Sequence, residues 1–257
     1  MPAGVAGLQA FSRGAVARLG DRCWPRTVVG VGSRPLVTRR DLQVLTFAAE
    51  QFGLPMALAA ELASRHAAGT LGRQAAERVV RRTAARLEAG SYARRLIVAG
   101  EVWLVPTGRG LALVADPDER PYEVWRPQGW KLEHVATAAR LRLWLCDRYP
   151  GAAWESERAI RRRWATVHRA SGVDTRTRYA DGGLHLPHGK AVGVEVELHI
   201  KKPPLYEGIA VDQDTAWTAG VWWFTPPGQV ELLRARLAAA GAVDHQVYPL
   251  PEQVAGR

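Results

Sequence analysis

The run "YADGGLHLPHGKAVGVEVELHIKK" alternates like a half-buried β-hairpin, but it carries Asp181, Glu195, Glu197 and Lys201 among its apolar residues. A carboxylate within a strand is costly to bury unless hydrogen bonds or a positive group meet it. The acids therefore have two interpretations. Either they form a solvated outer face that nearby arginines neutralise, or they hold a metal ion.

The loop Pro187-His188-Gly189 predicts the register of this hairpin. Proline sets the first turn dihedral, and glycine accepts the left-handed conformation that the loop requires. Leu186 then faces Lys190, and Asp181 lies directly opposite Glu195. The period of two places one set of side chains on the apolar face: Leu184, Leu186, Val192, Val194, Val196, Leu198 and Ile200. The opposite face carries Asp181, His185, Glu195, Glu197, His199 and Lys201.

The opposed carboxylates Asp181 and Glu195 suit a hard cation. Like charges directly opposite each other destabilise a sheet, and β-carbons in such pairs lie ~5 Å apart. Mg²⁺ or Mn²⁺ prefers oxygen ligands and completes its octahedron with water. Such an ion would polarise a phosphodiester and activate a water molecule. The hairpin therefore predicts a metal site for phosphodiester chemistry, with the solvated face as the alternative.

The elements around the hairpin predict an α/β domain over residues 132–257, after a linker at 119–131. A helix runs from Leu132 to the Pro150-Gly151 stop, and "AAWESERAI" reads as a strand leading into a short helix. After the hairpin come a partly helical segment "PPLYEGIAVDQDTA", a buried strand "GVWWFT", a helix "GQVELLRARLAAAG" and a final strand "DHQVYPL". This α-β-β-β-α-β order, with an extra helix and strand, is typical of a compact α/β layer.

Residues 36–118 predict three helices followed by a hairpin. Thr38 and Asp41 form close to a capping box for the first helix. That helix carries Leu42, Leu45 and Phe52 on one face and ends at Gly53. Pro55 starts the second helix. The third runs from Arg73 to Gly90 and has an apolar stripe of Ala76, Val79, Val80, Thr83 and Leu87. Two apolar strands around Ala99-Gly100-Glu101 then form a hairpin, and a short helix starts at Thr107.

This order is that of a winged helix-turn-helix, whose third helix enters the major groove of DNA. Arginine and glutamine on that helix can contact phosphates or base edges. The polar side of the third helix supplies the candidate DNA-binding residues Arg73, Gln74, Arg78, Arg81 and Arg82. The alternative is that these side chains are only a solvated helix face.

The distribution of charge also favours a polyanionic partner. The net charge is +10, and residues 1–120 hold 17 arginines against 10 acids. Such a basic half is typical of proteins that bind DNA or RNA. Cys23 and Cys146 are too few for a disulfide framework, which favours a reducing cytoplasm. No apolar run approaches the ~18 residues of a membrane span. Residues 1–35, rich in Gly and Arg, read as a mobile arm.

Several motifs together resemble the replication-relaxation family of plasmid and mobile-element proteins. They are "TRRDLQVL", the arginine-rich third helix, "LVPTGRGLALV", "LEHVATAARLRL", "WESERAI" and "ADGGL…VEVELHIKK", between residues 37 and 225. The resemblance implies binding of DNA, duplex most of all, and a role in plasmid replication, DNA relaxation or transfer.

The C-terminal half also resembles PD-(D/E)XK nucleases. The resemblance implies catalytic roles for Asp181, Glu195, Glu197 and Lys201, and a Mg²⁺ or Mn²⁺ ion held by Asp181, Glu195 and the upstream Glu157. Glu197 departs from the pattern, because these nucleases place a lysine there. Lys201 has the right strand parity but lies six residues beyond Glu195, about 20 Å along a straight strand. Two hypotheses follow: a DNA-binding nuclease or nickase, or a non-enzymatic regulator whose inactive nuclease-like domain binds partners or forms a homodimer.

Overall fold

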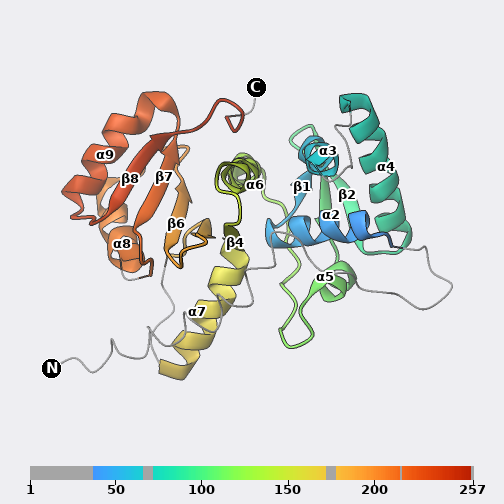
Figure 1. Ribbon diagram of the computed structural model, residues 1–257, viewed down its shortest axis with the longest axis horizontal. Coiled ribbons are helices and arrows are strands. Elements are labelled where there is room, and N and C mark those ends of the chain that lie inside the picture. Colours follow the sequence, from blue (N-terminus) through green and yellow to red (C-terminus); the bar gives the residue numbers. More distant parts are fainter. Residues whose placement is uncertain (1–36, 66–71, 172–177, 215, 256–257) are drawn as a thin grey trace. The chain divides into compact units, whose positions relative to one another are not determined.

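The computed structural model describes residues 37–65, 72–171, 178–214 and 216–255 of the chain (Figure 1). The predicted arm at residues 1–35 lies outside this part. The fold is mixed α/β, with helices and two separate sheets. It divides into two compact units within one helix, between Ala139 and Arg140. We call the described residues up to Ala139 the N-terminal unit and those from Arg140 the C-terminal unit.

The N-terminal unit contains the predicted three helices and hairpin. In chain order its elements are α2 (Arg39–Glu50), β1 (Leu54–Pro55), α3 (Met56–Arg65), α4 (Arg73–Ala89), β2 (Ala93–Val98), β3 (Glu101–Pro106) and α5 (Gly108–Val114). The sheet order is β1-β3-β2, and both pairings are antiparallel. Ala99 and Gly100 connect β2 to β3 with φ of 51° and 80°. Two left-handed residues in succession give the tight turn that matches the twist of a hairpin.

The start of α2 is the predicted capping box, but its end differs from the prediction. The Thr38 side chain accepts the Asp41 N–H, and the Asp41 carboxylate accepts the Thr38 N–H. The helix ends at Glu50, so Phe52 is not part of its apolar face, and that prediction was wrong. Phe52 has a left-handed φ of 67°, which breaks the helix and turns the chain toward β1. Its ring packs instead against Trp125, 6.0 Å between centroids.

Helix α4 buries the predicted stripe with one difference. Ala76, Val80, Thr83 and Leu87 are buried together with Ala84, whereas Val79 is half-buried. The buried side chains of α2, α3 and β3 include Leu45, Leu58, Leu62, Trp103 and Leu104. The apolar face of α4 therefore faces the interior of the unit, which leaves its arginine-rich side outside.

An ion pair joins the start of α2 to α4. Arg86 Nε and Nη2 donate to the two carboxylate oxygens of Asp41, at 2.8 and 2.6 Å. The Asp41 side chain is fully buried, whereas Arg86 keeps about a third of its surface exposed. A bidentate pair of this kind fixes the mutual orientation of two helices as well as contributing energy.

The predicted linker at residues 119–131 includes one residue that packs firmly. No helix or strand covers residues 115–128, and α6 (Gly129–Arg148) begins next. Within this segment, the ring of Trp125 lies 6.0 Å from those of Phe52 and Trp103. The early residues of α6, Leu132, Val135 and Ala136, join the same core cluster. The part of the segment around Trp125 is thus anchored on the N-terminal unit.

The C-terminal unit contains a mixed five-stranded sheet. Its elements after α6 are β4 (Ala153–Ser156), α7 (Glu157–Ser171), β5 (Gly182–His185), β6 (Ala191–Val196), α8 (Pro203–Asp214), β7 (Val221–Thr225), α9 (Val230–Ala239) and β8 (His245–Pro249). The order is β4-β5-β6-β7-β8. The first three strands are antiparallel, and β6, β7 and β8 are parallel. Every predicted strand is present, and α7 is a full helix rather than a short one.

Helices cover both faces of the parallel half of this sheet. Trp223 of β7 packs with Tyr206 of α8 and with Leu233 and Leu237 of α9. The neighbouring residue Phe224 points the other way and meets Trp144 of α6, 6.3 Å between ring centroids. Figure 1 shows α8 and α9 beside β7 and β8. In the part of the chain that the structure describes, no helix combines the length and apolar character needed to cross a membrane.

Candidate functional site

The hairpin formed by β5 and β6 has the predicted register. Leu186 N–H donates to the Lys190 carbonyl at 2.8 Å, and Gly189 adopts a φ of 83°. Gly182 pairs with Val194, and Leu184 pairs with Val192. The ladder ends at the pair Gly182 and Val194, so Asp181 and Glu195 lie one step beyond the paired residues, where the same register would set them opposite each other. The loop residues predicted this register.

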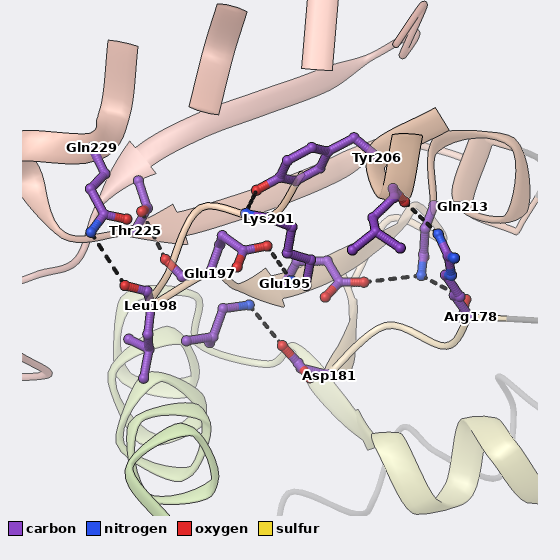
Figure 2. A network of polar contacts seen from close by, with 12 residues as sticks. Arg178, Asp181, Glu195, Glu197, Leu198, Lys201, Tyr206, Gln213, Thr225 and Gln229 are labelled. Atoms are coloured by element: carbon purple, nitrogen blue, oxygen red, sulfur yellow. Dashed lines mark hydrogen bonds and ion pairs between the residues drawn. The ribbon is translucent and has the colours of Figure 1, made fainter. Parts of the chain in front are cut away.

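Asp181 and Glu195 belong to a cluster of acids at the end of β6 (Figure 2). Asp181 Oδ2 accepts the backbone N–H of Val196 at 2.8 Å. Burial raises the pKa of Glu195 well above its usual value, and the nearby charges of Asp181, Glu157 and Glu197 raise it further, against an opposing effect of Lys201. The sheet thus concentrates negative charge at one place without matching it fully.

The chain leaves the strand immediately after Val196, and this brings Lys201 back to the acids. The turn is held by four hydrogen bonds: Glu197 N–H to Phe224 O, Thr225 Oγ1 to Glu197 O, Gln229 Nε2 to Leu198 O, and Lys201 N–H to Tyr206 Oη. Lys201 Nζ forms an ion pair with the Glu197 carboxylate. A straight strand would carry the ammonium group far away, so the early end of β6 decides the composition of the cluster.

Glu197 is the most enclosed acid of the cluster, with a side chain only 3% exposed. Burial raises the pKa of Glu197, Asp181 adds to the rise, and Lys201 opposes it. Tyr206 lies on the other side of the turn, and burial raises its pKa to about 12. A phenol with such a pKa stays protonated near neutral pH. Tyr206 therefore serves as a hydrogen-bonding group here and is a poor nucleophile.

Glu157 lies close enough for Glu195 to feel its charge, but it already has a cationic partner. Arg161 Nε donates to Glu157 Oε1 at 2.8 Å, and Arg161 Nη2 contacts the same oxygen. Its neighbour Glu155 points elsewhere and meets Arg163 and His185. His185, expected on the polar face with the acids, is thus engaged by Glu155.

The residues present fit a hard cation in their chemistry but offer few ligands. Among the described residues, no three His, Cys, Asp or Glu side chains gather closely enough to hold a metal ion. Asp181 and Glu195 supply the carboxylate oxygens that Mg²⁺ or Mn²⁺ prefers, and water would have to fill most other positions. A site with one or two carboxylates and several waters is ordinary for Mg²⁺.

Two residues of this region had no recognisable signal in the sequence. Gln213 Nε2 donates to Glu195 Oε1 at 3.0 Å, and Tyr206 accepts the Lys201 N–H. Both come from α8, a helix that follows the hairpin along the chain. A glutamine within an ordinary helix pattern carries no local mark, and only packing of α8 on the sheet reveals its partner.

The second candidate surface is the outer side of α4. Arg73, Gln74, Arg78, Arg81 and Arg82 are all exposed. Arg73 and Arg81 both reach Glu77, at 3.1 and 3.6 Å. Arg78 and Arg82 form no ion pair with any described acid. Arg94 on β2, which the sequence did not single out, is also exposed and has no acidic partner in the described part of the chain.

Comparison of the chain with models of protein families, with curated proteins and with solved structures finds no match.

Proposed function

We propose that the protein binds duplex DNA through α4 of the N-terminal unit. The order α2-α3-α4 followed by the β2–β3 hairpin supports a winged helix-turn-helix, in which the third helix enters the major groove. Strand β1 adds the third strand that such a sheet commonly has. Because α4 buries its apolar side, its arginine-rich side is left for a partner.

The observation that carries this proposal is the exposure of Arg78 and Arg82 on α4 without an ion-pair partner in the part of the chain that the structure describes. Both are exposed and lie one helical turn apart, without an acidic partner among the described residues. Other arginines of the unit do have such partners: Arg65 pairs with Glu61, Arg86 with Asp41 and Arg95 with Glu88. Unpaired guanidinium groups on one helix face are suited to phosphate and to guanine edges.

DNA binding across a salt series tests this proposal. Arg78→Glu/Arg82→Glu should weaken binding to plasmid fragments and flatten the dependence of affinity on salt, because fewer counterions are released. Arg65→Glu/Arg234→Glu changes the net charge equally but alters arginines outside α4, so it should bind nearly as the parent does. Equal losses in the two variants would show that only net charge matters and would remove α4 from the interface.

For the C-terminal unit we propose a metal-dependent, nuclease-like site that cleaves or nicks DNA. The antiparallel β4-β5-β6 meander and the crossover through α8 to the parallel strand β7 support a PD-(D/E)XK-like core. Asp181 and Glu195 would hold Mg²⁺ or Mn²⁺, which would polarise the phosphodiester and activate a water molecule. Lys201, returned to the cluster by the early end of β6, would place an ammonium group where a lysine of the strand is expected.

A non-enzymatic regulator is the second candidate, and one observation favours it. Glu197 stands where the lysine of these nucleases is expected, and its carboxylate engages Lys201. A lysine held in this way is less available to a phosphate. In this alternative the C-terminal unit is an inactive nuclease-like platform for a partner or a second copy. A role in plasmid replication, DNA relaxation or transfer rests on the motif resemblance alone.

Plasmid relaxation and cleavage with Mg²⁺ or Mn²⁺ separate the two candidates. The nuclease proposal expects metal-dependent nicking by the parent and none by Asp181→Ala or Asp181→Asn. The Asn variant is the sharper one, because its side-chain oxygen can still accept the Val196 N–H. DNA binding by all three proteins without nicking by any of them would support the regulator instead.

A further inference from the structure

Gln213 is a buried residue whose side-chain amide is fully used. Its Oε1 accepts the indole N–H of Trp217 at 2.8 Å. Its Nε2 donates to Glu195 Oε1 at 3.0 Å and to the Arg178 carbonyl at 3.1 Å (Figure 2). The indole nitrogen of tryptophan can only donate. It therefore fixes which end of the amide is the oxygen, and the NH₂ group must face Glu195.

Trp217 is itself fixed by the glycines of the hairpin. A β-carbon built on Gly183 would lie 2.4 Å from the Trp217 ring, and one on Gly193 would lie 2.6 Å away. These two glycines are a cross-strand pair on the same sheet face as Asp181 and Glu195. The indole thus rests on bare backbone, and any side chain at either glycine would displace it. The glycines of "DGG" and "VGV" therefore leave the space that Trp217 needs to reach Gln213, the hydrogen-bond partner of Glu195.

We infer that Gln213 is the positioning residue for Glu195, with Trp217 setting the orientation of its amide. The inference rests on the proposed function, in which Glu195 is a metal ligand. With Oε1 engaged by the Gln213 N–H, the second carboxylate oxygen of Glu195 would be the one left to bind a cation. Carboxylate ligands of metals are commonly held by a hydrogen bond in this way, and loss of the partner typically costs 10–100-fold in metal affinity.

Mn²⁺ binding by the full chain, measured by electron paramagnetic resonance and by the metal-dependent rise in melting temperature, tests the inference. Gln213→Met keeps the side-chain length but cannot donate, and we expect a loss of about 10-fold in Mn²⁺ affinity. Trp217→Phe keeps an aromatic ring over Gly183 and Gly193 but removes the donor. The Gln213 oxygen then loses its donor, whereas the NH₂ group keeps Glu195 and the Arg178 carbonyl as acceptors, so a smaller loss of affinity is expected.

The double variant separates positioning from general damage to the fold. If Trp217 acts through Gln213, Trp217→Phe should cause no further loss of affinity in the Gln213→Met background. Independent, additive losses would overturn the inference, as would parental affinity in both single variants. Absence of Mn²⁺ binding by the parent would overturn the metal site itself, and this result is distinct from the other two. Should Gln213→Met fail to fold, the Mn²⁺ affinity of Trp217→Phe alone still tests the inference: a loss supports it, and parental affinity overturns it.

Discussion

Asp41 in the N-terminal unit and Glu195 in the C-terminal unit are both acids drawn into folded protein, and their surroundings treat the charge in opposite ways. For Asp41, burial opposes ionisation, but hydrogen bonds from Arg86, Thr38 and Thr83 outweigh it and lower the pKa. For Glu195, burial and the charge of Asp181 raise the pKa, and Lys201 opposes them only in part. One acid is compensated where it lies; the other is left among like charges.

This difference separates an acid whose charge is compensated by its hydrogen-bond partners from an acid that lies among like charges. The Asp41–Arg86 pair closes on itself, since both carboxylate oxygens receive a guanidinium N–H. The acids near Glu195 outnumber the cation beside them, and clusters of this kind are common at functional sites. Variants that remove one of the acids should therefore have opposite effects on stability in the two units.

The largest effect is expected for Asp41→Ala. It removes a helix cap and leaves Arg86 without its partner, so the free energy of unfolding should fall by about 3 kcal/mol. Thermal or urea unfolding of the full chain measures this loss. Glu61→Ala breaks an exposed pair with Arg65 and should cost only about 0.3 kcal/mol. A similar loss in the two variants would mean that the buried pair contributes no more than a surface one.

Lys201→Met should be next, with a loss of about 2 kcal/mol in the absence of metal, because a buried carboxylate loses its ion pair. The adjacent Lys202 is exposed and forms no ion pair with a described acid, so Lys202→Met is a matched control and should change little. If the two variants have the same melting temperature, the contact between Lys201 and Glu197 does not stabilise the protein.

Glu195→Gln should change the dependence of stability on pH. Since the folded-state pKa of Glu195 is raised, the parent should lose stability as pH rises above the usual glutamate value of about 4.3. Asp41 contributes the opposite slope: its pKa is lowered, so its stabilisation is present at neutral pH and lost only as pH falls through the folded-state pKa. Between pH 5 and 8 the melting temperature should therefore depend less on pH for Glu195→Gln than for the parent. An unchanged dependence of melting temperature on pH would show that burial and the neighbouring acids do not raise the pKa of Glu195.

The smallest effect is expected for Asp181→Asn, a gain of about 0.5–1 kcal/mol without metal, because one of two opposed charges is removed. The amide keeps an acceptor for the Val196 N–H. Asp181→Ala should gain less, since it leaves that N–H without its acceptor. Added Mn²⁺ should raise the melting temperature of the parent by mass action and leave Asp181→Asn unchanged. A loss of stability in Asp181→Asn would argue that Asp181 is structural, as Asp41 is.

Local chemistry in the sequence was enough for several features. The capping box of α2 and the Pro187-His188-Gly189 loop depend on neighbours along the chain, so pattern and turn residues predicted both. The register that brings Asp181 and Glu195 one step beyond the pair Gly182 and Val194 followed from that loop. The exposure of the α4 arginines followed from its apolar stripe, because a helix that buries one side must expose the other.

Only the tertiary structure decided which groups meet the acids. Lys201 returns to Glu197 because β7 and α8 hold the chain in a turn after Val196, and no local pattern marks where a strand stops pairing. Gln213 reaches Glu195 because Trp217 rests on two glycines from different strands. The Arg86 partner of Asp41 lies 45 residues away along the chain. Each of these contacts depends on the packing of distant segments, which residue type and spacing alone do not encode.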